Sequence, residues 1–246
     1  MESNNNTILI TGGGSGIGQA LAHRLHDLGN HVIIAGRRLD ALARAAEGRS
    51  RITAIQVDLD DATSIEAFAH RLTIDHPTLN VLINNAGIMR FEALEHRRDL
   101  ADAEATVTTN LLGPIRLTNA LVDHLLTQPS ASIVNVTSGL AFVPLVVSPT
   151  YNASKAAIHS YTVSLREALK GRIDVIEVIP PQVKTGLTPG QEQREGVPLG
   201  DFADDVVMQL CSEPTRPEIT VQYSQYARRA EADGRFDEVF AMINGG

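Results

Sequence analysis

The stretch Thr11-Gly12-Gly13-Gly14-Ser15-Gly16-Ile17-Gly18 decides the fold. It follows a short β-branched run, Thr7–Thr11, and leads into an apolar stripe at helical spacing. The stripe consists of Ile17, Ala20, Leu21, Leu25 and Leu28. Glycines let the backbone turn tightly and let a diphosphate approach without meeting a β-carbon, and the helix start offers it free N–H groups. We therefore predict a strand, a phosphate-binding turn and a helix; the alternative is a turn that is only flexible.

Outward from this stretch, short β-branched runs alternate with helical segments. The further runs are His31–Ala35, Thr53–Val57, Val81–Asn84, Ser132–Val136, Asp174–Ile179 and Glu218–Val221. Most are nearly continuous in apolar residues, which is typical of strands covered on both faces. One helix begins behind Asp60 or Asp61 as N-cap, and later helices are expected at Phe202–Leu210 and Tyr226–Ile243. The alternation predicts an α/β fold: a doubly wound parallel sheet in a three-layer α/β/α sandwich, forming a single domain over residues 1–246.

Composition excludes several classes of protein. The chain has 246 residues, of which 43% are hydrophobic and 20% charged, so it is not a disordered chain, a collagen or a disulfide miniprotein. Its net charge of −8 argues against nucleic acid or an anionic membrane as a partner. The single cysteine, Cys211, fits a reducing compartment, and no apolar run approaches the roughly 18 residues of a membrane span. We expect a cytoplasmic protein.

Five motifs then follow one another in a fixed order. Thr11, Gly12, Gly16 and Gly18 form the pattern TGxxxGxG, and Asn84-Asn85-Ala86-Gly87 follows a predicted strand. Asn110 lies in a helical stretch, Ser138 follows another strand, and Tyr151 and Lys155 form YxxxK 13 residues after that serine. In these motifs the sequence resembles the short-chain dehydrogenase/reductase family over almost its whole length. The resemblance implies a Rossmann-type fold that binds a nicotinamide dinucleotide.

The resemblance also implies which residues hold the dinucleotide. They are Gly12, Gly14, Ser15, Gly16, Ile17, Gly18, Arg37, Arg38, Asp58, Leu59, Asn85, Ala86, Gly87, Tyr151, Lys155, Pro181, Val183 and Thr185. Asp58 and Leu59 match the family's adenine-contacting pair, although Asp58 is also suited to capping a helix. At residues 180–185 the family's PGxVxT is replaced by PPQVKT, a Pro-Pro form that occurs in a poorly characterised branch of oxidoreductases. Pro181 removes a backbone N–H and fixes φ there.

The end of the second predicted strand indicates which dinucleotide is bound. NAD enzymes usually place an acidic residue there for the ribose 2′-hydroxyl, but this chain continues with Arg37 and Arg38. A guanidinium pairs with a 2′-phosphate, so we predict NADP (NADPH), with Arg37 as the main contact. The alternatives are that both arginines are solvated residues at a helix start, or that the chain is an NAD-preferring dehydrogenase.

Tyr151 and Lys155 stand at i and i+4, so they share one helix face. An ammonium favours the phenolate and lowers the pKa of a tyrosine, which suits proton transfer. The resemblance assigns Tyr151 as general acid or base, Lys155 to the nicotinamide ribose, Ser138 to the substrate oxygen, and Asn110 to bending its helix and holding a relay water. The alternatives are a surface Tyr-Lys pair, a turn serine and a helix-side asparagine.

We therefore predict an oxidoreductase that uses NADP(H) and a Tyr-Lys proton relay on a small-molecule carbonyl or alcohol. A partly apolar wall at Phe142, Val143, Leu145 and Val146, and a substrate loop at about 185–200, suggest a substrate of modest size. A non-catalytic NADP-binding sensor is the alternative from another class. No metal is expected, because His23 and His26 lack a third ligand. The resemblance also implies a homodimer or homotetramer, formed through the helices of Asn110 and Tyr151.

Overall fold

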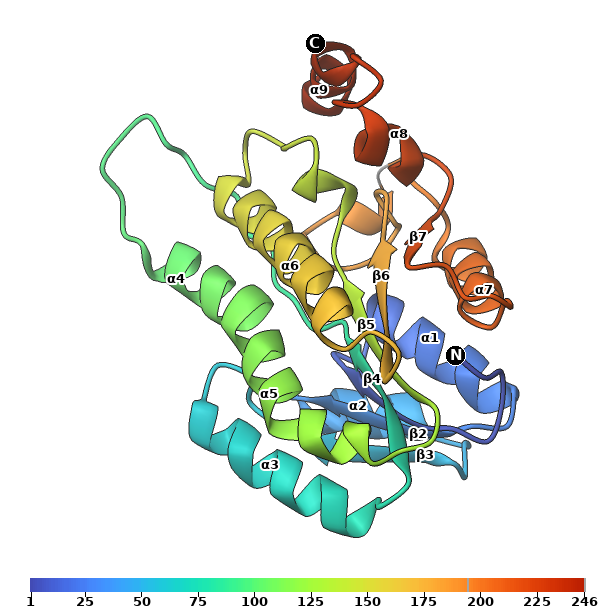
Figure 1. Cartoon of the computed structure of the whole chain (residues 1–246). Helices are drawn as coiled ribbons and strands as arrows, with labels where there is room; N and C mark the ends of the chain where they lie inside the picture. The colour runs from blue at the N-terminus through green and yellow to red at the C-terminus, as the bar shows by residue number, and fades with distance from the viewer. Residues whose placement is uncertain (194, 246) are drawn as a thin grey trace.

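The computed structural model describes residues 1–193 and 195–245 (Figure 1). Seven described strands form one sheet in the order β3-β2-β1-β4-β5-β6-β7, and every neighbouring pair is parallel. The strands are β1 (Thr7–Thr11), β2 (His31–Gly36), β3 (Ile52–Gln56), β4 (Leu79–Asn84), β5 (Ala131–Val136), β6 (Ile173–Ile179) and β7 (Glu218–Thr220). Each lies within a few residues of a run predicted from the sequence.

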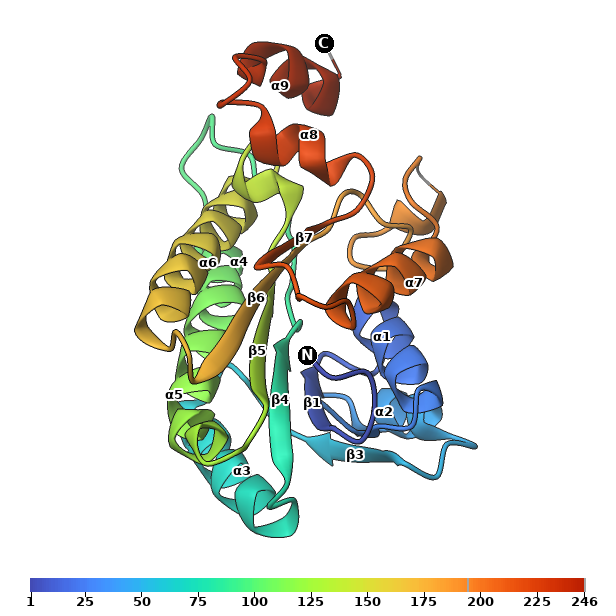
Figure 2. The same cartoon turned by 45° about the vertical axis from the view of Figure 1, so that its right-hand side comes forward.

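Helices cover both faces of this sheet (Figures 1 and 2). On one face lie α1 (Gly16–Asp27), α2 (Leu39–Ala46) and α7 (Leu199–Leu210). On the other lie α3 (Ala62–Asp75), α4 (Ala101–Val107), the π-helix η1 (Thr108–Leu112), α5 (Gly113–Leu126) and α6 (Pro149–Ala168). The predicted doubly wound, three-layer α/β/α sandwich is therefore confirmed. Within the described residues, no helix combines the length and apolar character that crossing a bilayer requires.

Alternate residues of the central strand enter two separate cores. In β1, Ile8 and Ile10 pack with the helices α1, α2 and α7, whereas Leu9 packs with α3 and α5. All three side chains are fully buried. Because successive side chains of a strand point to opposite faces, a continuous apolar run is what a sheet covered on both faces needs.

Two predicted helix starts can be compared with the structure. Asp61, not Asp60, is the N-cap of α3, because its carboxylate accepts a hydrogen bond from the Thr63 N–H at 2.8 Å. Helix α7 begins at Leu199, three residues before the predicted Phe202.

The single helix predicted at Tyr226–Ile243 is wrong. The segment forms two helices, α8 (Ser224–Arg229) and α9 (Phe236–Asn244). Between them Gly234 adopts φ +67°, a left-handed conformation that ends helical geometry, and the Arg235 N–H donates to the Ala230 carbonyl. Figure 2 shows α8 and α9 stacked at the end of the molecule beyond β7.

The strand order reverses between β1 and β4. From β1 the sheet grows through β2 and β3 on one side, and from β4 through β5, β6 and β7 on the other. At such a point the loops leaving the carboxyl ends of neighbouring strands diverge and leave a crevice. Every motif singled out in the sequence lies in or beside the connections at this edge.

Candidate active site

A cavity of about 1200 Å³ opens at the carboxyl ends of the strands. It is larger than a typical pocket for one small molecule, about 300–1,000 Å³. Most predicted site residues line it: Gly12, Gly14, Ser15, Gly16, Ile17, Arg37, Arg38, Leu59, Asn85, Ala86, Gly87, Ser138, Tyr151, Lys155, Pro181, Val183 and Thr185. Gly18, Asp58 and Asn110 do not belong to the described lining.

The glycine turn after β1 brings backbone close to this cavity. Gly12 and Gly16 have φ of +69° and +54°, which side-chain-bearing residues rarely adopt. Gly18 lies behind the turn, where a β-carbon would collide with the Gly12 carbonyl oxygen. Its structural role is close packing of α1 against the turn, and Gly16 and Ile17 of the first turn of α1 line the cavity.

Hydrogen bonds hold the glycine turn against the segment that follows β4. The Thr11 hydroxyl accepts from the N–H groups of Asn85 and Ala86 at 3.0 and 3.1 Å. The Asn85 side-chain amide donates to the Thr11 carbonyl at 2.8 Å. A β-carbon on Gly12 would lie 2.9 Å from the Ala86 Cα, so the two backbones touch. The motifs TGxxxGxG and NNAG thus form one rigid floor.

Arg37 and Arg38 lie at the far end of the cavity, beyond β2. Arg37 forms a 3.2 Å ion pair with Asp60, whose other carboxylate oxygen accepts from the Thr109 hydroxyl. Arg38 is exposed at the start of α2. Asp58 is exposed and lies outside the cavity lining, and its carboxylate accepts from the Asp60 N–H at 3.0 Å. The acid that lines this end of the cavity is Asp60, which the sequence analysis considered only as a cap.

Ser138, Tyr151 and Lys155 are buried together on the opposite wall. The Lys155 ammonium donates to the Val136 carbonyl at 2.9 Å and lies 5.7 Å from the centre of the Tyr151 ring. The Ser138 hydroxyl accepts from the Leu140 N–H at 3.1 Å, so Ser138 also caps the short 3-10 helix η2 (Gly139–Ala141).

Burial controls the ionisation of both titratable residues. It raises the pKa of Tyr151 to about 12, although the hydrogen bond with Ser138 acts in the opposite direction. It lowers the pKa of Lys155 to about 8. In the protein without cofactor the pKa of Tyr151 therefore lies above its ordinary value, and a lowering by the Lys155 ammonium stays a prediction. Loss of solvation is the larger cause, because burial disfavours the charged phenolate.

Asn110 lies in the π-helix that interrupts α4 and α5. Its side chain is buried and forms two 2.8 Å hydrogen bonds with Ile88, accepting from the N–H and donating to the carbonyl. It also donates to the Ser154 hydroxyl at 3.2 Å. A β-carbon on Gly87 would lie 3.2 Å from the Asn110 Oδ1 and 3.7 Å from the Lys155 Nζ. Asn110 therefore holds the segment after β4 against α6. It does not line the cavity itself but lies behind Gly87 and Ile88, which do.

The Pro-Pro segment follows β6 and closes the middle of the cavity. The Pro180 carbonyl accepts from the Gly139 N–H, next to Ser138, at 2.9 Å. Val183 pairs with Val197 in an isolated parallel bridge, and Thr185 faces Gly16. The predicted substrate loop at about 185–200 includes Arg194, which lies outside the described residues. Its other residues include the 3-10 helix η3 (Gln191–Gln193) and the start of α7.

The C-terminal segment contributes to the cavity; its helical pattern had suggested either a cover for the pocket or part of a subunit interface, without indicating the residues involved. Tyr223, Tyr226, Ala227, Val239, Met242 and Ile243 all line the cavity. No family motif marks them, and the single predicted helix could not show which of its faces meets the cavity.

A cluster of His159, Glu177 and Glu218 was not predicted from the sequence. Their ligand atoms lie within 4.8 Å of one another, a spacing that metal sites use. Protein donors already bind these carboxylates, however. Glu177 accepts from His159 Nδ1 at 2.8 Å and from the Thr137 hydroxyl at 2.7 Å, and Arg228 forms a two-pronged ion pair with Glu218. A cation here would have to compete with Arg228.

Comparison with known sequences gives concordant matches. The sequence model described as short chain dehydrogenase matches residues 6–196. An uncharacterized oxidoreductase of Bacillus subtilis, DltE, is 38% identical over 252 residues, covering 99% of this chain and 100% of the relative. Sulfoacetaldehyde reductase 2 of Chromohalobacter salexigens is 34% identical over 186 residues, covering 74% of each chain.

Solved structures share the fold at lower identity. A short chain dehydrogenase from Burkholderia cenocepacia in complex with NADP superposes with a TM-score of 0.85, at 24% identity and 99% coverage of both chains. A short chain dehydrogenase/reductase from Burkholderia phymatum in complex with NAD also has a TM-score of 0.85, at 22% identity and 96% coverage of both chains.

Proposed function

The chain belongs to the short-chain dehydrogenase/reductase family of oxidoreductases, and from that premise we propose that it transfers a hydride between NADP(H) and a small-molecule carbonyl or alcohol. One observation carries the proposal. A single cavity holds a glycine turn and two arginines at one end, and a buried serine, tyrosine and lysine on the opposite wall. NADP has its groups in a matching order: the adenosine with its 2′-phosphate at one end, the diphosphate between the two ribose rings, and the reacting ring at the other end.

The residues present fit such a cofactor. Gly12, Gly14 and Gly16 line the cavity with backbone alone, and a 12-residue helix begins directly behind this turn. β-Carbons on Gly12 and Gly14 would crowd the backbone of Ala86 and Leu42, so the turn can pack this closely only with glycine. Asn85, Ala86 and Gly87 would form the floor, and Pro181, Val183 and Thr185 the side nearest the nicotinamide. When bound, the nicotinamide supplies or accepts the hydride.

Tyr151 would serve as the proton donor in carbonyl reduction. With its pKa raised to about 12, the phenol is protonated at neutral pH and able to give its proton to the developing alkoxide. Lys155 would hold the ribose hydroxyls and place a positive charge beside the phenolate that remains. Ser138 would donate a hydrogen bond to the substrate oxygen, and Asn110 would keep Ile88 and α6 in place.

Turnover distinguishes this proposal from a non-catalytic NADP-binding sensor. The test is a panel of aldehydes, ketones and alcohols, followed by nicotinamide absorbance with each of the two cofactors. Turnover of at least one carbonyl with NADPH is the expected result. Tight NADPH binding without turnover of any panel member would favour the sensor. The intact Ser138, Tyr151 and Lys155 argue for the enzyme, since a sensor needs no proton relay.

The second candidate is an NAD-preferring dehydrogenase, and Asp60 is the observation in its favour. This carboxylate already pairs with Arg37, so a 2′-phosphate would have to share that guanidinium. Arg38 supplies a second cation nearby. We expect Arg37→Ala and Arg38→Ala each to weaken NADPH binding about tenfold or more and to leave NADH binding nearly unchanged. Titration calorimetry measures both affinities. Arg71→Ala, at an exposed position of α3, is the control for the loss of a surface arginine.

Equal NADPH affinity in the parent and both arginine variants would refute the phosphate clamp. The homodimer or homotetramer and the cytoplasmic location expected from the sequence remain predictions.

A further inference from the structure

Two segments of the chain form the wall of the cavity beside the proposed reaction centre: the segment after Ser138 and the C-terminal segment. Leu140 and Leu145 line it from the segment directly after Ser138. The C-terminal helices α8 and α9 line it with Tyr223, Tyr226, Ala227, Val239, Met242 and Ile243. We call these eight residues the C-terminal wall. Apart from the two phenol hydroxyls, its side chains are hydrocarbon or thioether.

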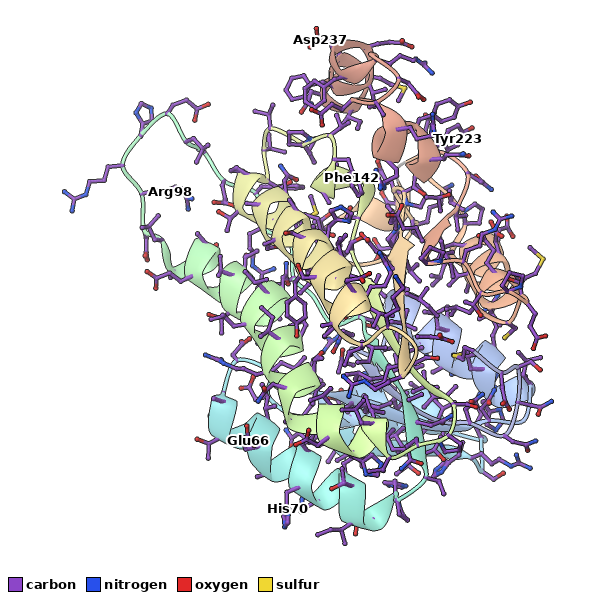
Figure 3. All side chains as sticks on the ribbon, in the orientation of Figure 1. Glu66, His70, Arg98, Phe142, Tyr223 and Asp237 are labelled. Carbon is purple, nitrogen blue, oxygen red and sulfur yellow. The ribbon has the colours of Figure 1, made fainter. Side chains whose placement is uncertain are left out.

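Large apolar side chains of this wall are unusually exposed. Tyr223 is 67% exposed, Tyr226 52% and Met242 64%, and the two tyrosine rings stack at 6.5 Å. A group of exposed aromatic and aliphatic side chains that lines a cavity is typical of a surface that a ligand covers. Figure 3 shows Tyr223 at the start of α8 and Asp237 in the first turn of α9.

The arginines of the C-terminal segment pair with carboxylates of that segment or of the sheet edge, and they do not line the cavity. Arg228 binds Glu218, Arg229 binds Asp233, and Arg235 binds Glu238. The described charged residues that line the cavity come from other elements: Arg37, Arg38, Asp60, Arg90, Lys155 and Glu192. The Arg235 guanidinium lies 5.6 Å from the Tyr226 ring centre, but it is already paired with Glu238, so a charged substituent against this wall would lose water without gaining a free counter-ion.

The wall is fixed to the segment that carries Ser138. The Asn244 amide donates to the Pro144 carbonyl at 3.1 Å and its oxygen accepts from the Val146 N–H at 2.8 Å. Val143 packs in a small core with Ala227, Ala230 and Val239. Arg228 also lies 4.8 Å from the Phe142 ring centre. The wall therefore keeps a defined position relative to Ser138 and Tyr151.

We propose that the C-terminal wall is a substrate subsite for an uncharged apolar substituent, an aromatic ring or a branched hydrocarbon, attached to the reacting carbonyl or carbinol carbon. The inference rests on the proposed function, because it takes Ser138 and Tyr151 as the reaction centre. The carbonyl oxygen lies at these two residues, and the substituent covers Tyr223, Tyr226 and Met242. Shape and hydrophobic burial then select the substrate.

The test measures binding and turnover separately. Benzyl alcohol is titrated by calorimetry into the NADPH-saturated protein, a pair that cannot exchange a hydride, using the parent, Tyr223→Ala, Met242→Ala and Met208→Ala. Met208 is equally exposed on α7 but does not line the cavity, so it controls for loss of a surface methionine. We expect Kd to rise about tenfold in the first two variants and to stay unchanged in the control. Melting temperatures verify that all four proteins are folded.

Turnover uses benzaldehyde and glycolaldehyde with NADPH. The ratio of their kcat/KM values should fall about tenfold in Tyr223→Ala and Met242→Ala and stay constant in Met208→Ala. Equal benzyl alcohol affinity in all four proteins, or no binding to the parent, would overturn the subsite. Glycolaldehyde turnover without benzyl alcohol binding would overturn the subsite and support the proposed function. Variant-sensitive binding without turnover of any carbonyl would support the subsite and contradict the proposed function.

Discussion

Burial acts in opposite directions on the pKa values of Tyr151 and Lys155. It raises the first to about 12 and lowers the second to about 8, because each charged form loses solvation. At neutral pH the tyrosine is therefore a protonated donor, and the lysine still carries most of its charge. This state suits carbonyl reduction. In the proposed mechanism alcohol oxidation would require the tyrosine to lose its proton, so that direction would depend more on the positive charge of Lys155.

The pKa of Lys155 predicts a pH-dependent stability in the cofactor-free protein. A lysine has a pKa near 10.5 when unfolded and about 8 in this site, so between these values the unfolded chain binds more protons. Stability from this residue is then complete above pH 10.5 and is lost as pH falls towards 8. From pH 8 to pH 10 the free energy of unfolding should rise by about 2–3 kcal/mol relative to Lys155→Met.

Urea titrations of both proteins across this pH range measure the difference. A difference that stays constant with pH would show that the buried ammonium is better solvated than its burial indicates. Above pH 10 the raised pKa of Tyr151 lowers the free energy of unfolding as pH rises, so the comparison ends at pH 10.

At the scale of elements, the contact between α1 and the glycine turn tolerates no β-carbon at Gly18. That carbon would collide with the backbone oxygen of Gly12. A backbone atom cannot rotate out of the way as a flexible side chain can, so the turn itself would have to shift. Gly18→Ala should lower the free energy of unfolding by about 1–3 kcal/mol. Gly200→Ala on α7 is the matched control, since its β-carbon would meet only Arg24 at 3.6 Å. We expect that control to be neutral or stabilising by up to about 1 kcal/mol.

Thermal or urea unfolding of the two alanine variants decides the point. Equal stabilities would mean that the turn can shift away from α1, and that its geometry is less fixed than the described contacts indicate.

The helix of Asn110 shows a limit of sequence reasoning at the same scale. The sequence predicted a helix bent at this residue only through a family resemblance. The structure has a π-helix at Thr108–Leu112, and Asn110 uses it to reach Ile88 and Ser154. A π-helix differs from an α-helix by one residue in a turn, and the spacing of apolar residues does not reveal so small a change.

For the whole molecule, the sheet and the position of the site could be predicted because both depend on local patterns. Continuous apolar runs such as Ile8–Ile10 require cover on both faces, and parallel strands place the residues that follow them at one edge. That is why Arg37, Asn85 and Ser138, far apart in the sequence, line the same cavity.

The residues that form the C-terminal wall could not be predicted, because long-range contacts determine them. Asn244 bonds to Pro144, and Arg228 to Glu218, and neither contact leaves a periodic pattern in the sequence. The break at Gly234 and the rise in the Tyr151 pKa have the same origin. Both depend on what surrounds the residue in the folded chain, which propensity and spacing do not contain.

Proton donation by Tyr151 is the central claim of this account. The most direct measurement is the rate of NADPH oxidation with the best carbonyl of the panel, in the parent, Tyr151→Phe and Tyr161→Phe. Tyr161 lies on the same helix outside the cavity lining, so it controls for loss of a phenol hydroxyl. We predict that Tyr151→Phe lowers kcat about 10²–10⁴-fold while Tyr161→Phe stays near the parent. A Tyr151→Phe variant that turns over at the parental rate would contradict the account.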